Sequence, residues 1–197
     1  MGWLIGLLVL AGLAIAWFAG TYNGLVKLRN RFKNAFAQID VQLTRRHDLI
    51  PNLVEVAKGY MKHERETLDA VISARNAASS ELDVAKGKPG DAGVMGALSQ
   101  AEGKLAGALG RFNMVMEDYP DLKANQNFLD LQAQLEGTEN RINVERNRYN
   151  EAVNIYDIHT TKFPNKLLAG WFGFEEMPRY QADPGSEKAP EVNFEFD

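Results

Sequence analysis

The histidine and carboxylate side chains are the groups of this 197-residue chain that could bind a metal ion or transfer a proton. A di-iron site in a helical bundle requires the spacing Glu-x-x-His, and none of the three histidines has a glutamate three residues before it. His63-Glu64 begins like the zinc motif His-Glu-x-x-His, but Thr67 occupies the place of the second histidine. The chain also lacks cysteine and a glycine-rich phosphate loop. We therefore predict no enzyme activity and no catalytic, cofactor or metal site, and we interpret all three histidines as surface or turn residues: His47, His63 and His159.

Two polar stretches stand out, at residues 45–48 and 140–154. Asparagine is a poor helix former, so its abundance in the second stretch requires compensating contacts. Arg46 interrupts the apolar repeat of its helix, and Glu139 or Glu145 could pair with it. Such a polar layer would fix the register of the helices at a cost in stability; alternatively, these residues form a surface for a partner or another subunit. The candidates for either role are Arg45, Arg46, Asp48, Glu139, Asn143, Glu145, Asn147 and Asn150.

The helices that must position these residues are indicated by apolar side chains three and four residues apart. In the soluble part of the first helix, this repeat is interrupted at Arg46 and resumes in the same phase at Ile50. Pro51 removes a backbone donor, so we expect a kink between these two residues. Asp48 is then placed to cap the helical segment that restarts there.

Three further helices are predicted from the same spacing. The second follows a turn at residues 59–63 and ends in a loop at residues 86–91. The third carries a repeat over residues 94–119 and ends at Pro120, and the fourth starts near Asp121 and stops at Pro164. The expected fold class is all-α, with an N-terminal transmembrane helix continuing into an up-down-up-down bundle of long antiparallel helices.

Residues 3–20 contain no charged group, and the first charge in the chain is Lys27. About 18 apolar residues in a helix come close to spanning a ~30 Å hydrocarbon core. A cleaved signal peptide is the alternative, but the segment lacks a basic start, and bulky Trp17-Phe18 follow its small residues. We therefore expect an uncleaved anchor. The expected anchor positions are of two kinds: tryptophans at the two ends of the segment, and small residues that permit close helix contact in lipid. They are Trp3, Gly6, Gly12, Ala16, Trp17 and Gly20.

The basic residues follow this segment, which by the positive-inside rule places the bulk of the chain in the cytoplasm. We therefore expect a single-pass membrane protein, and the family resemblance described below implies that this membrane is the bacterial inner membrane. In an up-down bundle the fourth helix returns to the membrane, so the aromatic segment after it should lie at the lipid headgroups; alternatively, these aromatics cap the bundle end. The residues of this patch are Lys166, Trp171, Phe172 and Phe174.

Three regions are expected along the chain. Residues 1–21 are the anchor, residues 22–163 the helical bundle, and residues 164–197 the aromatic segment and a polar tail. We interpret the tail, from Glu175 onwards, as disordered or as an extended wrap around the bundle.

Residues 48–54 read Asp-Leu-Ile-Pro-Asn-Leu-Val, which is a specific motif. Through this motif and the segments given at the end of this paragraph, the chain resembles the LemA family of bacterial membrane proteins, although an aspartate follows Tyr156 where asparagine is common in relatives. The resemblance implies an anchor, a bundle of long helices and no catalytic residues. It also associates the chain with the cell envelope and, in one branch, with the formation of internal membranes. Further matching segments are Tyr22–Val26, Asp40–His47, Glu117–Ala124, Thr138–Ile142, Arg146–Asn150, Phe163-Pro164 and Gly173-Phe174.

The charge pattern indicates which classes of binding partner to expect. The net charge is −4, with both signs mixed along the chain, which argues against nucleic acid. Expected partners are membrane lipid and further copies of the chain. The favoured function is a self-assembling scaffold that organises or shapes membrane; the alternative is a monomeric or small-oligomer adaptor for another envelope or signalling protein.

Overall fold

The computed structural model describes residues 1–180, and residues 181–197 lie outside that description. All regular elements of the described residues are helices, which confirms the predicted fold class. They are α1 (Gly2–Lys58), α2 (Arg65–Gly87), α3 (Ala92–Met116), α4 (Pro120–Lys123), α5 (Gln126–Thr161) and α6 (Asn165–Phe172).

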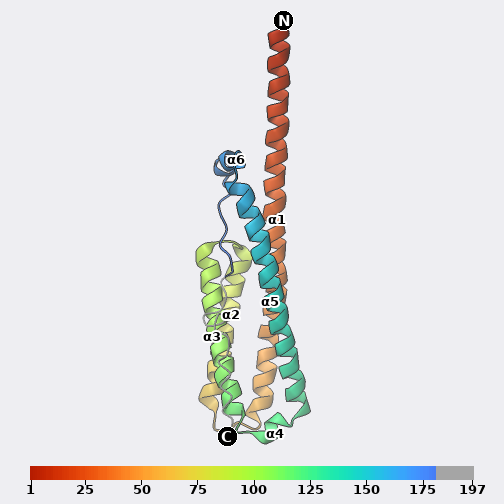
Figure 1. The fold of residues 1–197 in the computed structure, drawn as a ribbon. Helices are drawn as coiled ribbons and strands as arrows, with labels where there is room; N and C mark the ends of the chain where they lie inside the picture. The colour runs from red at the N-terminus through yellow and green to blue at the C-terminus, as the bar shows by residue number, and fades with distance from the viewer. Residues whose placement is uncertain (181–197) are drawn as a thin grey trace, which may run out of the picture.

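Helix α1 is one continuous helix that joins the apolar N-terminal segment to the bundle (Figure 1). Its apolar part is exposed and is long and apolar enough to cross a membrane. Pro51 lies inside α1 without interrupting it. The expected restart, with Asp48 as its cap, is therefore wrong: mid-helix backbone donors already bond to carbonyls one turn earlier. Buried Ile50 and Leu53 hold this turn in the core, so the loss of one hydrogen bond at proline is tolerated.

The helices α1, α2, α3 and α5 run alternately away from and back towards the apolar segment, as an up-down-up-down bundle (Figure 1). Two helix starts are capped by side chains: Asp91 accepts from the Val94 N–H at 2.9 Å, and Asn125 accepts from the Phe128 N–H at 3.0 Å. The fourth long helix thus begins at Gln126 and not near Asp121, because residues 120–123 form the separate turn α4.

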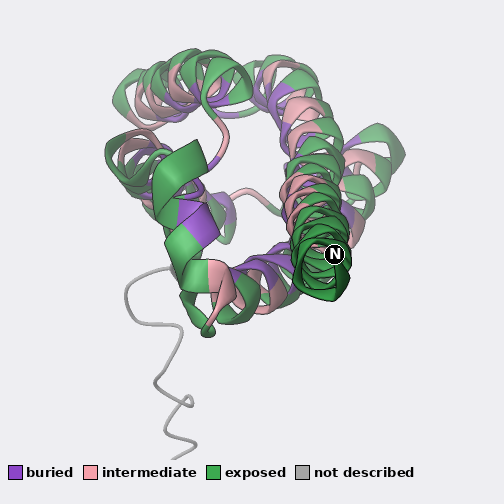
Figure 2. Cartoon of the chain, turned by 90° about the horizontal axis from the view of Figure 1, so that it is seen from above, coloured by how far each residue is buried: buried purple, intermediate pink, exposed green. Residues whose placement is uncertain are grey.

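The bundle interior contains two hydrophobic clusters, which we call the upper core and the lower core. The upper core lies nearer the apolar segment of α1 and includes Phe32 and Tyr156, whose ring centroids are 5.3 Å apart. The lower core lies at the far end and includes Phe112 and Phe128, with centroids 6.2 Å apart. Seen from above, the buried surfaces of the helices face one another across the interior (Figure 2).

The chain turns back after α6. Gly173 ends this helix with φ +67°, a backbone conformation that favours glycine. Residues 174–180, which we call the strap, then descend in an extended conformation along the bundle (Figure 1). The strap is held on α5 by side-chain hydrogen bonds described below.

Candidate functional site

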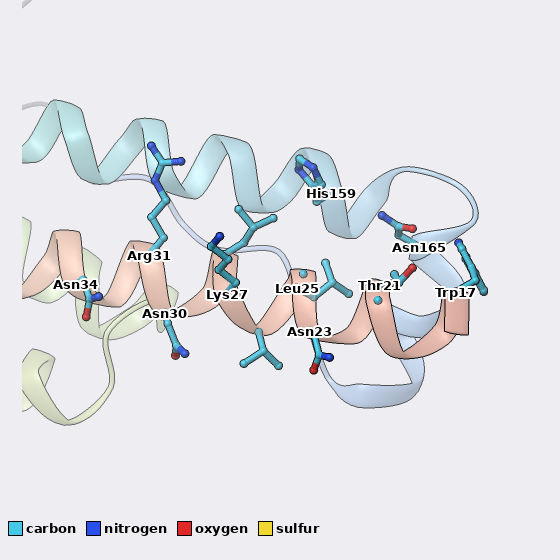
Figure 3. Close-up of a pocket in the computed structure, with 14 residues that line it drawn as sticks. Trp17, Thr21, Asn23, Leu25, Lys27, Asn30, Arg31, Asn34, His159 and Asn165 are labelled. Carbon is cyan, nitrogen blue, oxygen red and sulfur yellow. The ribbon is translucent and has the colours of Figure 1, made fainter. Parts of the chain in front are cut away.

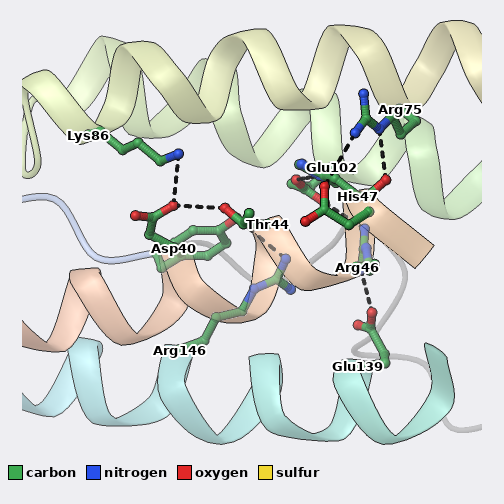
Figure 4. Close-up of polar contacts among 11 residues, drawn as sticks. Asp40, Thr44, Arg46, His47, Arg75, Lys86, Glu102, Glu139 and Arg146 are labelled. Carbon is green, nitrogen blue, oxygen red and sulfur yellow. Dashed lines mark hydrogen bonds and ion pairs between the residues drawn. The ribbon is translucent and has the colours of Figure 1, made fainter. Parts of the chain in front are cut away.

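A buried ionic layer separates the upper core from the lower core. Arg46 of α1 donates to Glu102 Oε2 of α3 at 2.6 Å, and His47 Nε2 meets Glu102 Oε1 at 2.8 Å. Both oxygens of this glutamate are therefore occupied. Figure 4 shows the three side chains converging from two helices.

Two further residues complete this layer from other helices. Arg46 also pairs with Glu139 of α5, so one guanidinium joins two carboxylates. Arg75 of α2 donates from Nε to the backbone carbonyl of His47 at 2.8 Å (Figure 4). Arg75 also lies 3.7 Å from the carboxylate of exposed Asp48. The layer therefore ties α1 to α2, α3 and α5 at one height of the bundle.

The chemistry open to this layer is limited by its burial. Arg46, His47 and Glu102 are almost fully buried, so a substrate has no access to them. Within residues 1–180 no group of three or more histidine, cysteine, aspartate or glutamate side chains is placed to hold a metal ion. A buried ion pair is weak as a source of stability, since desolvation offsets the attraction, but it specifies which helices meet and in what register. The arrangement favours a structural role.

The sequence interpretation of this layer was correct for one partner and incomplete for the others. Glu139 pairs with Arg46 as expected, whereas Glu145 pairs with Arg148 at 2.7 Å. The prediction that His47 is a surface or turn residue is wrong: the side chain is buried, and Glu102 Oε1 is the partner of its Nε2. The position of Glu102 was a usable signal: it lies four residues after Leu98 on the buried face of α3.

The asparagine-rich stretch of α5 binds the strap. Asn150 accepts from the Tyr180 N–H at 2.7 Å and donates to its carbonyl at 3.1 Å, as a neighbouring strand would. One turn later, Asn154 accepts from Arg179 at 2.8 Å, and Asp157 accepts from the Met177 N–H at 3.0 Å. These contacts compensate for the low helix propensity of Asn150 and Asn154. The other expected members of the polar surface are exposed: Arg45, Asp48, Asn143 and Asn147.

Burial at the contact between α5 and the strap changes the acidity of three side chains. Desolvation raises the pKa of Tyr149 and of Tyr156 to about 12 each. Desolvation also raises the pKa of Asp157, although the Met177 N–H opposes this change. Tyr149 Oη donates to the Pro178 carbonyl at 3.4 Å, whereas Tyr156 Oη has no hydrogen-bond partner among the described residues.

The expected aromatic patch lies beside the apolar segment of α1, but not all of the residues predicted for it are exposed there. Phe172 packs edge-on against Phe18 at 5.5 Å and Tyr22 at 5.1 Å. Trp171 is 80% exposed, and Lys166 is also exposed. Phe174 is only 5% exposed, because the turn at Gly173 directs the chain back into the upper core. The exposed patch therefore consists of Lys166, Trp171 and part of Phe172.

The expected anchor positions are open along the first part of α1. Trp3 and Trp17 are exposed near its two ends, and Ala16 is also exposed. A Cβ atom added at Gly6, Gly12 or Gly20 would meet no atom within 4 Å.

Comparison with known proteins gives a consistent result. The model of the LemA family matches residues 35–194. The magnetosome protein MamQ 2 of Paramagnetospirillum magneticum is 27% identical, over 92% of this chain and 74% of that protein. The magnetosome protein MamQ of Magnetospirillum gryphiswaldense is 24% identical, over 84% of this chain and 66% of that protein. Protein LemA of Metamycoplasma hominis is 25% identical, over 78% of this chain and 63% of that protein.

Proposed function

Because the chain belongs to the LemA family, we propose that it is a membrane-anchored, self-assembling helical scaffold of the bacterial cell envelope. Many copies stand side by side in this proposal and organise or shape the bilayer. The relatives named as magnetosome proteins belong, by that name, to a defined cellular body. A structural role is compatible with the burial of Arg46, His47 and Glu102 in this chain.

The observation that carries the proposal is the stiff connection between the apolar segment and the bundle. Helix α1 passes from one into the other without a break, and Phe172 of α6 packs against Phe18 and Tyr22 of α1. The soluble part of α1 extends roughly 55 Å at 1.5 Å per residue. A rod held at its base by two contacts keeps one orientation to the membrane, so each copy offers the same flank to its neighbours.

The glycines of the apolar segment support close packing of such copies. Gly6, Gly12 and Gly20 leave open space on α1. Small residues let membrane helices approach until their backbones are in van der Waals contact. Neighbouring copies can therefore associate in the bilayer as well as through their bundles.

Electron microscopy of the full-length protein, extracted together with its lipid, tests this function. We expect regular assemblies for the wild type. Insertion of Gly-Gly-Ser after Gly20 should abolish them without unfolding the bundle, since it uncouples the bundle from the membrane helix. The matched control is the same insertion after exposed Lys62, in the loop at the far end. If the wild type forms only small particles, the scaffold is refuted and the adaptor function is favoured. Crosslinking would then identify the partner of the adaptor.

The proposed orientation, with the bundle in the cytoplasm, has its own test. The chain contains no cysteine, so one introduced thiol reports on one position. A membrane-impermeant maleimide should label Gly2→Cys in intact inner-membrane vesicles of native orientation, and Lys88→Cys only after the membrane is opened. The reverse labelling pattern would overturn the orientation and leave the scaffold proposal intact.

A further inference from the structure

A groove runs along the flank of α1, directly after the apolar segment (Figure 3). Its volume is about 1110 Å³. Trp17 and Gly20, at the end of the apolar segment, line one end of the groove, and Asn165 of α6 adds an amide. The groove is therefore continuous with the part of the protein that is proposed to lie in lipid.

The polar end of this groove carries positive charge that has no carboxylate partner within residues 1–180. Lys27 and Arg31 project from α1 towards α5, on the side where His159 lies, whereas Asn30 and Asn34 point the other way (Figure 3). Both cations are exposed, and neither pairs with a carboxylate anywhere in residues 1–180. None of the described residues that line the groove is acidic.

His159 is oriented for a third contact. Its Nδ1 lies 2.8 Å from the Ile155 carbonyl, which makes Nδ1–H the donor of this bond. The ring nitrogen Nε2 is therefore the atom left to meet a ligand. A phosphate group accepts hydrogen bonds from ammonium, guanidinium and imidazole groups alike, and such charge-assisted bonds are the stronger ones.

We infer that this groove binds the phosphate-bearing headgroup of an anionic phospholipid. Lys27, Arg31 and His159 contact the phosphate, Asn165 contacts the glycerol ester groups nearer the membrane, and Trp17 packs against the start of the acyl chains. The inference rests on the proposed membrane anchoring, because only then is a headgroup delivered at this height. Anionic headgroups attract basic residues next to a membrane helix, whereas zwitterionic headgroups carry no net charge to attract them.

Native mass spectrometry of the full-length protein tests the site. The protein is released from nanodiscs containing equal amounts of phosphatidylglycerol and phosphatidylcholine, and the lipids retained per chain are counted. We expect a preference for phosphatidylglycerol that falls about fivefold in Lys27→Gln or Arg31→Gln and about thirtyfold in the double variant. The matched control is Lys33→Gln/Lys88→Gln, which removes two exposed lysines that do not line the groove.

Each outcome decides the inference. Equal loss of preference in the control variant, or no preference in the wild type, would overturn it, because general surface charge would then suffice. Displacement of the retained lipid by soluble glycerol 3-phosphate would identify a free phosphate ester as the ligand and overturn the lipid source. Failure of the chain to enter nanodiscs would refute the membrane anchoring itself, whereas entry without lipid preference refutes the groove alone.

Discussion

Arg46 of α1 and Glu102 of α3 meet at 2.6 Å in the middle of the bundle, with side chains that are 5% and 0% exposed. The pair lies between two hydrophobic cores and joins residues 56 positions apart. Desolvation of both charges is costly, and their mutual attraction with His47 and Glu139 offsets that cost only while the set is complete. The layer thus penalises every arrangement of the helices that separates its members.

Removal of one member should therefore be severe. Glu102→Ala leaves the buried Arg46 and His47 without their shared acceptor, and we expect a loss of about 3 kcal/mol in the free energy of unfolding. Glu151→Ala, at an exposed site on α5, is the control and should change it by less than about 0.5 kcal/mol. Urea denaturation followed by circular dichroism measures both. Equal stability of the two variants would contradict the role assigned to the layer.

Replacement of the three buried members of the layer separates stability from specificity. In the variant Arg46→Met/His47→Leu/Glu102→Leu, no buried charge is left unpaired, so stability should be within about 1 kcal/mol of the wild type or above it. We expect instead that the helices no longer hold a single axial register, which would broaden the methyl signals in the nuclear magnetic resonance spectrum. A triple variant as unstable as Glu102→Ala would show that the ions themselves stabilise the fold.

The strap should loosen when its double hydrogen bond is removed. Asn150→Ala takes away both the acceptor of the Tyr180 N–H and the donor to its carbonyl. Two hydrogen bonds worth about 1 kcal/mol each are lost, so hydrogen exchange at the amides of Met177, Arg179 and Tyr180 should become at least about tenfold faster. Asn147→Ala, one turn away and exposed, is the matched control. Unchanged exchange in Asn150→Ala would mean that packing alone holds the strap.

Removal of the hydroxyl group from two buried tyrosines should change the free energy of unfolding in opposite directions. Tyr156 Oη is buried and unpartnered among the described residues, so Tyr156→Phe should raise the free energy of unfolding by about 1 kcal/mol. Tyr149→Phe loses the hydrogen bond to the Pro178 carbonyl and should lower it by up to about 1 kcal/mol. Thermal unfolding of the two variants tests the pair. A destabilised Tyr156→Phe would show that this hydroxyl does have a partner in the folded protein.

Replacement by alanine should change the free energy of unfolding in opposite directions at two glycines of the α2–α3 hairpin. Gly90 has φ +97°, and an added Cβ would lie 2.7 Å from Met177 Sδ. Gly90→Ala should therefore destabilise the protein by about 1–2 kcal/mol. Gly96, inside α3, has nothing within 4 Å of an added Cβ, so Gly96→Ala should stabilise by up to about 1 kcal/mol. Denaturant titration distinguishes the two, and equal effects would contradict the assigned conformation of Gly90.

The exposed indole of Trp171 should rest among lipid headgroups if the bundle stands as proposed. In the variant Trp3→Phe/Trp17→Phe, all tryptophan fluorescence comes from this residue. Lipids brominated near the headgroup should quench it more strongly than lipids brominated at the chain ends. Trp3→Phe/Trp171→Phe, which keeps Trp17 on α1, provides the comparison at a known helix position. Absence of quenching at Trp171 would favour a cap on the bundle end.

Much of the fold could be predicted because its signals are local. Apolar side chains three and four residues apart identify each helix and its buried face, and short loops force neighbouring helices to be antiparallel. The return of the chain to the apolar segment follows from four helices in this order. The start of α5 was misplaced because Pro120 begins a separate short turn, and the cap at Asn125 carries a weaker signal than proline.

The amino-acid sequence by itself determined the apolar segment, the helices and their alternating direction, and it left Glu139 and Glu145 as alternative partners of Arg46, of which the structure shows Glu139. Only the tertiary structure decided that Glu102 and His47 join that pair, that Asn150 binds the strap, and that Phe174 turns into the core. The reason is that helical periodicity depends on neighbours within two turns, whereas these contacts join residues 30 or more positions apart. They depend on the rotation and axial shift of whole helices, which all core contacts set together.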